Sequence, residues 1–124
     1  MADLTLQQRF GSSVTFNATS KTLTIALNDL TDAGDIVDSL GLDISALSSA
    51  NINSYASKIL YGLILLNFQK QAATNNDDSV GLYIQNSGRR DATRNGIAQF
   101  AYNFNLAFYT ANNLAAVLDP DLVV

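Results

Sequence analysis

The residues best placed to do chemistry are three arginines that lie close together. Arg89, Arg90 and Arg94 are three of only seven basic residues in the chain. They fall in the stretch from Asn86 to Gly96, which we expect to be a loop because glycines bound the arginines. Guanidinium groups match carboxylate and phosphate geometry, so the loop is a candidate site for a small anion or a protein partner. The alternative is a solvated hairpin loop whose charges keep the tip soluble.

Two asparagines form a second candidate partner-binding site. Asn103 and Asn105 alternate with large apolar residues, and small Ala101 and Ala107 flank them in the same pattern. Asparagine is a poor strand former, so two of them on one face of a strand need a reason. A flat face of amides and alanines can accept another protein surface closely. It can equally be an ordinary solvated face, and the sequence leaves both interpretations open.

The acidic residues suggest a metal site only weakly. All eleven acids are aspartate, and four of them, Asp29, Asp32, Asp35 and Asp38, recur at every third position. Carboxylate oxygens suit Ca²⁺ or Mg²⁺, but the pattern of an EF-hand loop is absent. Acids in the first turns of a helix are also favoured by the helix dipole. We therefore interpret the series as helix caps and solvated surface, and we predict no metal site.

The residue types used most often in catalysis are missing. The chain has no histidine, cysteine or glutamate, which removes the usual metal ligands and the usual acid or base at neutral pH. The glycines form no phosphate-binding array. Ser54 and Lys58 are four residues apart, where a Ser-x-x-Lys nucleophile pair needs three. We expect a non-enzymatic protein with no catalytic residue and no cofactor.

Length and composition indicate one acidic globular domain. The chain has 124 residues, of which 48% are hydrophobic and 15% charged, so residues 1–124 can form a single domain with a core. A net charge of −4 argues against a protein that binds nucleic acid. The most apolar stretch, residues 59–66, is too short to span a bilayer, and the first residues lack the features of a signal peptide. We expect a cytoplasmic protein without a membrane or nucleic-acid partner.

Hydrophobic periodicity predicts the elements of the first two thirds of the chain. Alternating apolar residues on both sides of a polar turn predict a first β-hairpin over 14–27. Apolar residues at every third or fourth position predict the main helix from Ile52 to Ala73. Between residues 59 and 66 this helix is apolar nearly all round, which indicates that more than one side is covered. We expect a loose arm or a short lead-in over 1–12 and a shorter helix ending near Leu40.

An aromatic strand dominates the last third. The strict alternation of Phe100, Tyr102, Phe104, Leu106 and Phe108 predicts a strand over 97–109, paired with another over 80–85. A helix is the alternative, because Phe100, Phe104 and Phe108 also recur at helical spacing. That interpretation would place two asparagines inside a helix, so we favour the strand. A short helix is expected from 111 to 119.

The element order ββ-α-α-ββ-α predicts an α+β fold. We expect a four-stranded antiparallel sheet made of two hairpins, with the long apolar helix packed on one face and in contact with the aromatic side of strand 97–109. The favoured function is a structural or interaction protein that acts as a homo-oligomer or as a component of a larger assembly, through self-association or contact with another protein. The alternative is a small-molecule or anion-binding domain that uses Arg89, Arg90 and Arg94 or a pocket between sheet and helix.

Overall fold

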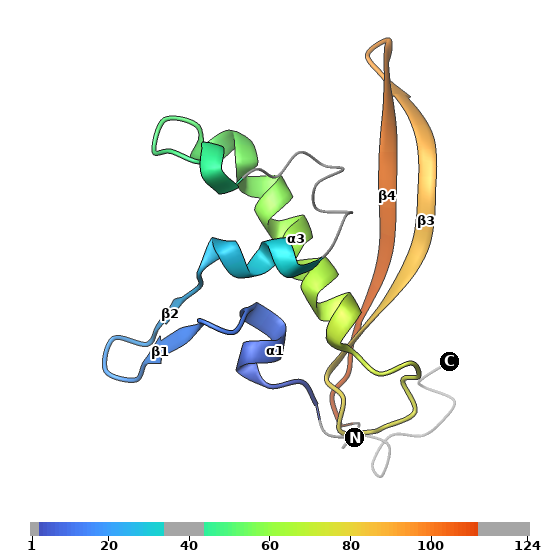
Figure 1. Cartoon of the computed structure of the whole chain (residues 1–124). Coiled ribbons are helices and arrows are strands. Elements are labelled where there is room, and N and C mark those ends of the chain that lie inside the picture. Colours follow the sequence, from blue (N-terminus) through green and yellow to red (C-terminus); the bar gives the residue numbers. More distant parts are fainter. Residues whose placement is uncertain (1–2, 34–43, 112–124) are drawn as a thin grey trace, which may run out of the picture.

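The computed structural model of the chain describes residues 3–33 and 44–111 (Figure 1). Its class is α+β, as predicted. The described elements, in chain order, are α1 (Leu6–Phe10), β1 (Thr15–Asn17), β2 (Thr22–Thr24), the 3₁₀ helices η1 (Leu27–Ala33), η2 (Ile44–Ala46) and η3 (Ile52–Tyr55), α3 (Ala56–Lys70), β3 (Leu82–Arg94) and β4 (Ile97–Phe108).

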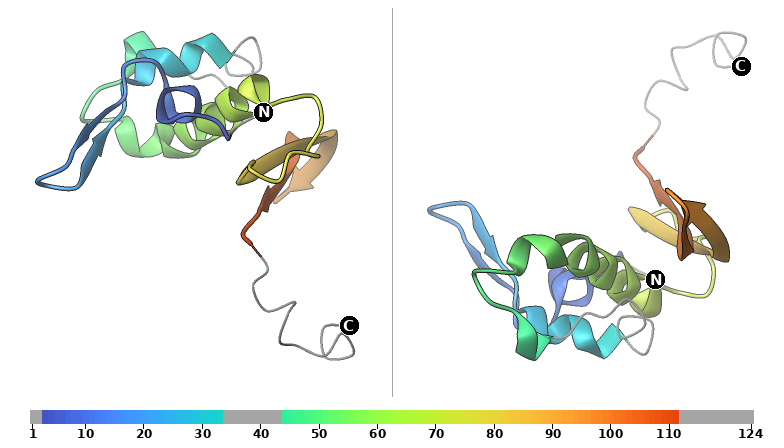
Figure 2. Two further views of the ribbon diagram at one scale, coloured as in Figure 1. Left: turned by 90° about the horizontal axis from the view of Figure 1, so that it is seen from below. Right: turned by 90° about the horizontal axis from the view of Figure 1, so that it is seen from above.

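The strands form two separate two-stranded antiparallel sheets, β1 with β2 and β3 with β4. The single four-stranded sheet expected from the sequence is not formed between these two hairpins. Figures 1 and 2 show the reason, because α3 lies between the short β1–β2 hairpin and the long β3–β4 hairpin. Each hairpin therefore meets the helices from its own side.

The first hairpin is confirmed, although it is shorter than predicted. Its strands pair Thr15 with Thr24 and Asn17 with Thr22, and the chain leaves the sheet after Thr24. The chain then forms η1 in place of the rest of the predicted strand. In η1, Leu30 is fully buried, and this burial favours the helix over a longer strand. The remainder of the helix predicted to end near Leu40 lies outside the described residues, as does the helix predicted at 111–119 beyond its first residue.

The expectation of a loose arm over residues 1–12 is wrong, because residues 6–10 form helix α1. A capping box starts this helix: the Thr5 hydroxyl accepts from the Gln8 backbone N–H, and the Gln8 side chain accepts from the Thr5 N–H. The two contacts satisfy backbone groups that a helix start leaves unpaired. Gly11 follows as the C-cap with a positive φ of 107°.

The main helix is confirmed over most of its predicted range. Residues 52–55 form a 3₁₀ turn, and α3 then runs from Ala56 to Lys70 instead of reaching Ala73. Helix α3 holds Leu65 and Leu66 in the core with Leu30 of η1, while Ile84 of β3 is also buried. Helix α1, η1 and the β3–β4 hairpin surround α3 (Figure 2), which explains why its sequence is apolar nearly all round.

The second hairpin is much longer than predicted. The loop expected from Asn86 to Gly96 is wrong, because β3 continues to Arg94 and pairs with β4 along its whole length. Only Asn95 and Gly96 form the turn, with φ of 52° and 74°. A two-residue turn of this kind requires positive φ at both positions, which Asn-Gly provides at low cost. The aromatic strand is confirmed as β4, and the helical alternative for it is wrong.

Candidate functional site

The β3–β4 hairpin carries every residue that the sequence analysis selected as a candidate site. Residues paired directly across the hairpin point to the same face. One face, here called the aromatic face, holds the large apolar residues of β4 from Phe100 to Phe108 and their partners on β3. The opposite face, here called the amide face, holds the odd-numbered residues of β4 together with their partners on β3. The β4 residues of this face include Gln99, Ala101, Asn103, Asn105 and Ala107.

A β-bulge divides the hairpin into an inner and an outer part. Asn86 pairs with Phe104 while Gly88 pairs with Asn103, so Ser87 has no cross-strand partner. Gly88 has φ of 93°, a backbone conformation that glycine adopts without strain. A bulge bends a strand and increases its local twist. The outer part, from Gly88 to the turn and back, projects past α3 (Figure 1).

Helix α3 covers the middle of the aromatic face, on both sides of the bulge. The Tyr61 ring meets Tyr102 edge-on with centroids 5.9 Å apart, and it meets Phe104 at 5.7 Å. The Phe68 ring contacts Phe104 in the same manner at 5.9 Å. Edge-to-face pairs of this kind are the geometry that aromatic rings prefer. These contacts confirm that the aromatic side of the strand meets the main helix.

The Tyr61 hydroxyl is an unusual feature of this contact. It is buried and has no hydrogen-bond partner among the described residues. Burial raises the pKa of the Tyr61 phenol, and the nearby Tyr102 phenol raises it further. The contact between α3 and the hairpin thus depends on ring packing, with no polar bond through this hydroxyl within the described chain.

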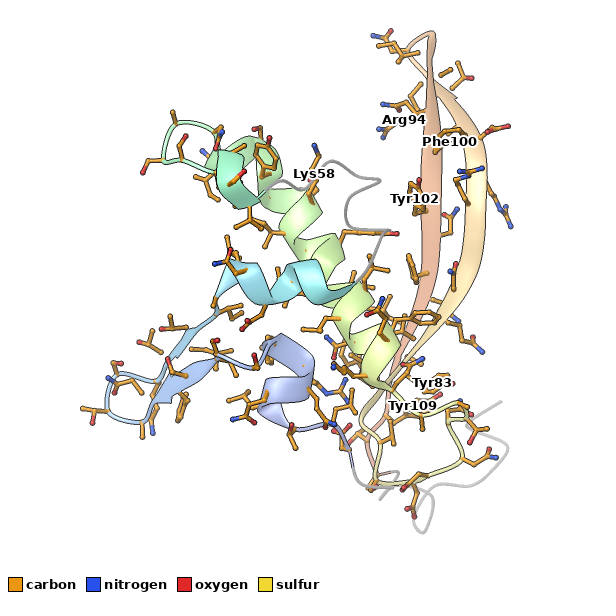
Figure 3. The ribbon with its side chains drawn as sticks, in the orientation of Figure 1. Lys58, Tyr83, Arg94, Phe100, Tyr102 and Tyr109 are labelled. Carbon is orange, nitrogen blue, oxygen red and sulfur yellow. The ribbon has the colours of Figure 1, made fainter. Side chains whose placement is uncertain are left out.

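The ends of the aromatic face are uncovered in the described structure. Phe100 is 58% exposed and Phe108 is 76% exposed. The Arg89 guanidinium lies on the Phe100 ring, with its central carbon 4.4 Å from the ring centroid. That arrangement is a cation–π contact and places Arg89 on the aromatic face. Figure 3 shows Phe100 in the outer part of the hairpin, beyond Tyr102.

The structure separates the three arginines. Arg90 pairs with Ala101 and therefore lies on the amide face, whereas Arg89 pairs with Tyr102 on the aromatic face. Arg94 is also on the amide face, where its Nε donates to the Gln99 Oε1 at 2.6 Å. Four of the five candidate residues thus share the amide face, and only Arg89 does not. A single anion cannot be held by all three arginines in this arrangement.

The two asparagines have different surroundings. The half-buried Asn103 side chain donates to the backbone carbonyls of Gly88 at 3.3 Å and Ala101 at 3.2 Å. It therefore supplies a donor at the bulge, which explains an asparagine in mid-strand. Asn105 is exposed and donates to the Gln85 side chain at 3.4 Å, a weaker contact. A role in binding a partner stays a prediction for both.

Gln71 is a structurally important residue that sequence reasoning missed. Its amide nitrogen donates to the Ile84 carbonyl at 2.6 Å, and its amide oxygen accepts from the Ile84 N–H at 2.9 Å. The side chain thus pairs with the outer edge of β3 as a neighbouring strand would. The Tyr83 hydroxyl adds a bond to the Ala73 carbonyl at 3.0 Å. In the inner part of the hairpin, the edge of β3 that faces away from β4 is therefore covered at Ile84 by the segment that follows α3.

A cavity of about 460 Å³ lies between α3 and the base of the hairpin. Its walls are mainly apolar, with Leu60 and Leu63 from α3 facing Leu106 and Phe108 from β4. Asp3, Arg9 and Asn67 supply polar groups, and Arg9 forms an ion pair with Asp3. Partial burial acts to raise the pKa of the Asp3 carboxyl, but hydrogen bonds from the Gly81 N–H and Arg9 hold it below its ordinary value.

The aspartate series is only partly described. The Asp29 carboxylate accepts from the Ser13 N–H at 2.8 Å, which gives it a structural role. Asp35 and Asp38 lie outside the described residues. Among the residues whose side chains the structure describes, which exclude Asp32, no three acidic groups come close enough together to hold a metal ion.

Comparisons with protein-family models, with curated proteins and with solved structures each found no match to this chain. In the described part of the chain, no helix combines the length and apolarity needed to cross a bilayer.

Proposed function

We propose that this chain is a non-enzymatic structural or interaction protein that acts as a homo-oligomer or as a component of a larger assembly. The observation that carries the proposal is the β3–β4 hairpin, which projects past α3 (Figure 1) and carries large apolar side chains that are exposed among the described residues. A two-stranded hairpin is marginally stable alone in water. Exposed apolar surface of this kind is typical of contact sites for another protein.

The distribution of apolar residues supports this proposal. Within the described part of the chain, five hydrophobic side chains form the buried core, Val14, Leu30, Leu65, Leu66 and Ile84. Twice as many large hydrophobic residues are exposed, and half of those belong to the hairpin or the residue after it: Ile97, Phe100, Leu106, Phe108 and Tyr109. The apolar surface left open by folding is therefore concentrated on one element.

The proposal predicts a multimer in solution. Size-exclusion chromatography with light scattering, at micromolar concentrations, should give a mass of at least twice the 13.3 kDa of the chain. Phe108→Ser should shift the protein toward monomer, because it removes the most exposed aromatic side chain of the hairpin. Phe16→Ser is the matched control, since Phe16 is 55% exposed on the other hairpin. This variant should remain a multimer. A wild-type monomer at high micromolar concentration would contradict the proposal.

The cavity between α3 and the hairpin favours a second candidate function, a small-molecule-binding domain. Its volume of about 460 Å³ lies in the range of ligand pockets, and it combines apolar walls with a few polar groups. An amphipathic molecule suits this combination, with its apolar part against Leu60 and Phe108 and its polar end near Arg9. Arg90 and Arg94 offer a separate position for a small anion on the amide face.

A thermal-shift screen tests the second candidate. Medium-chain carboxylates or aromatic amphiphiles should raise the melting temperature of the wild type. Leu60→Asp should abolish that increase without unfolding the protein, because Leu60 lines the cavity yet is 59% exposed. Leu23→Asp, on the other hairpin, should leave the increase intact. The proposal that this cavity binds a small molecule is wrong if no compound in a broad panel changes the melting temperature.

A further inference from the structure

Among the described residues, the free edge of β4 has none of the features that protect sheet edges. Its twelve residues, IAQFAYNFNLAF, include no charged residue, no proline and no glycine, and the register shift in the hairpin falls on β3. Natural proteins protect exposed edges with charges, prolines, bulges or a covering segment, because an unprotected edge pairs with other strands. Among the described residues, no segment pairs with the outer edge of β4.

The edge of β3 is protected along its length. Gln71 pairs with the backbone of Ile84 near the base. Further out, the bulge at Gly88 interrupts the strand, and the charged residues Arg89, Arg90, Asp91 and Arg94 follow it. The two edges of the hairpin therefore differ, and only the β4 edge is suited to pair with another strand.

The backbone groups available at the β4 edge can be identified from the hairpin register. The Tyr109 N–H donates to the Gly81 carbonyl at 2.9 Å, so Tyr109 points its backbone groups toward β3. In an antiparallel pair, alternate residues point these groups inward and outward. Phe100, Tyr102 and the other even-numbered residues of β4 thus direct their N–H and C=O groups away from β3.

We propose that the β4 edge pairs antiparallel with the β4 edge of a second copy, so that two hairpins form one four-stranded sheet across a two-fold axis. This proposal rests on the proposed function and specifies its partner and contact. A two-fold axis places residue i of one copy opposite residue j of the other, and the sum i + j is the same for every pair. This sum is even, because the outward-pointing residues of the two strands, which are even-numbered, must face one another. Even-numbered residues therefore meet even-numbered ones, so aromatic side chains align with aromatic side chains and amides with amides.

Charge favours a second copy as the occupant. Each chain carries a net charge of −4, yet β4 itself is uncharged, so the paired strands bring no like charges together. A charged partner segment would gain no complementary charge from β4. The two β3 strands become the outer edges of the sheet, where their charges, bulges and Gln71 contacts resist further pairing. The contact is therefore isologous and closes at two copies.

Paired proline variants test the edge directly. Phe100 and Asp91 are opposed across the hairpin, and both point their N–H groups outward, one on each edge. Phe100→Pro should lower the mass measured by light scattering toward that of the monomer. Proline lacks the backbone N–H that would donate to the second strand, and its ring blocks the β4 edge. Asp91→Pro introduces the same residue on the β3 edge and should leave the mass unchanged. Phe100→Ala separates loss of the ring from loss of the N–H and should retain most of the multimer.

The outcomes distinguish this inference from the broader proposal. If the wild type is a multimer and both proline variants keep its mass, the copies meet elsewhere and the β4 inference is wrong, while assembly stands. The inference is also wrong if Phe100→Ala abolishes the multimer as completely as Phe100→Pro. If both proline variants unfold the hairpin, hydrogen exchange on the wild type decides. Slow exchange of the Phe100 and Tyr102 amides that disappears on dilution to monomer supports edge pairing, and fast exchange at all concentrations overturns it.

Discussion

Replacing Leu65 with alanine is expected to lower the free energy of unfolding by about 2–5 kcal/mol, the usual range for a leucine truncated in a core. Leu65 has no exposed surface, and it packs in the cluster formed with Leu30 and Leu66. This cluster joins η1 to α3, so a cavity there weakens the contact between two elements. Few side chains of the described residues are fully buried, so little other packing remains to compensate for the loss of the Leu65 side chain.

Leu60→Ala provides the control within the same helix. Leu60 is 59% exposed, so its truncation should change the free energy of unfolding by less than about 1 kcal/mol. Urea unfolding followed by circular dichroism measures both variants, at one protein concentration because assembly adds to stability. Similar losses for the two leucines would show that α3 does not bury Leu65 in the way described.

Asn67→Ala is expected to cost roughly 2–4 kcal/mol, because it leaves several polar groups without partners. Asn67 is only 8% exposed. Its Nδ2 donates to the carbonyls of Arg9 and Leu63, both at 2.8 Å, and its Oδ1 accepts from Arg9 Nη1 at 2.9 Å. The side chain therefore joins α1 to α3 across 58 positions of sequence, and its loss should release α1.

An exposed amide and a double-mutant cycle complete this test. Asn75→Ala removes only an exposed bond to the Tyr109 hydroxyl, at 3.1 Å, and should cost less than about 0.5 kcal/mol. Combining Asn67→Ala with Arg9→Met should give a coupling energy of about 1 kcal/mol or more, since the two residues share their bonds. Additive losses would mean that the Arg9–Asn67 contact does not stabilise the fold.

Periodicity was sufficient to predict the elements whose side chains alternate regularly. The main helix and the aromatic strand follow from it, since each buries part of its surface. The first hairpin was also predicted by its alternation, although all six residues of β1 and β2 are exposed. The outer half of β3 does not alternate, because the bulge at Gly88 shifts the pattern and charged residues follow. Those residues are held in a strand by their pairing with β4, which propensity does not report. The Asn95–Gly96 turn was the local signal for that pairing.

The arrangement of the elements in space could not be predicted in the same way. Whether two hairpins share a sheet depends on which elements lie between them, and here α3 does. In the contact between Gln71 and Ile84, one side-chain amide forms hydrogen bonds with one backbone residue. No pattern in the sequence indicates such a contact. The capping box at Thr5 and Gln8, by contrast, was readable and would have predicted α1. The partner-binding roles of Arg90, Arg94, Asn103 and Asn105 stay predictions.

The Asn95–Gly96 turn also has a consequence for the order of folding. A hairpin with a two-residue turn brings together residues that are close in sequence, and such hairpins form in about 1–10 μs. The contact between Arg9 and Asn67 must close a segment of 58 residues, which costs more chain entropy and takes longer. We therefore expect β3 and β4 to pair before α1 docks on α3. In kinetic terms, the hairpin is therefore able to recognise another chain before α1 has docked.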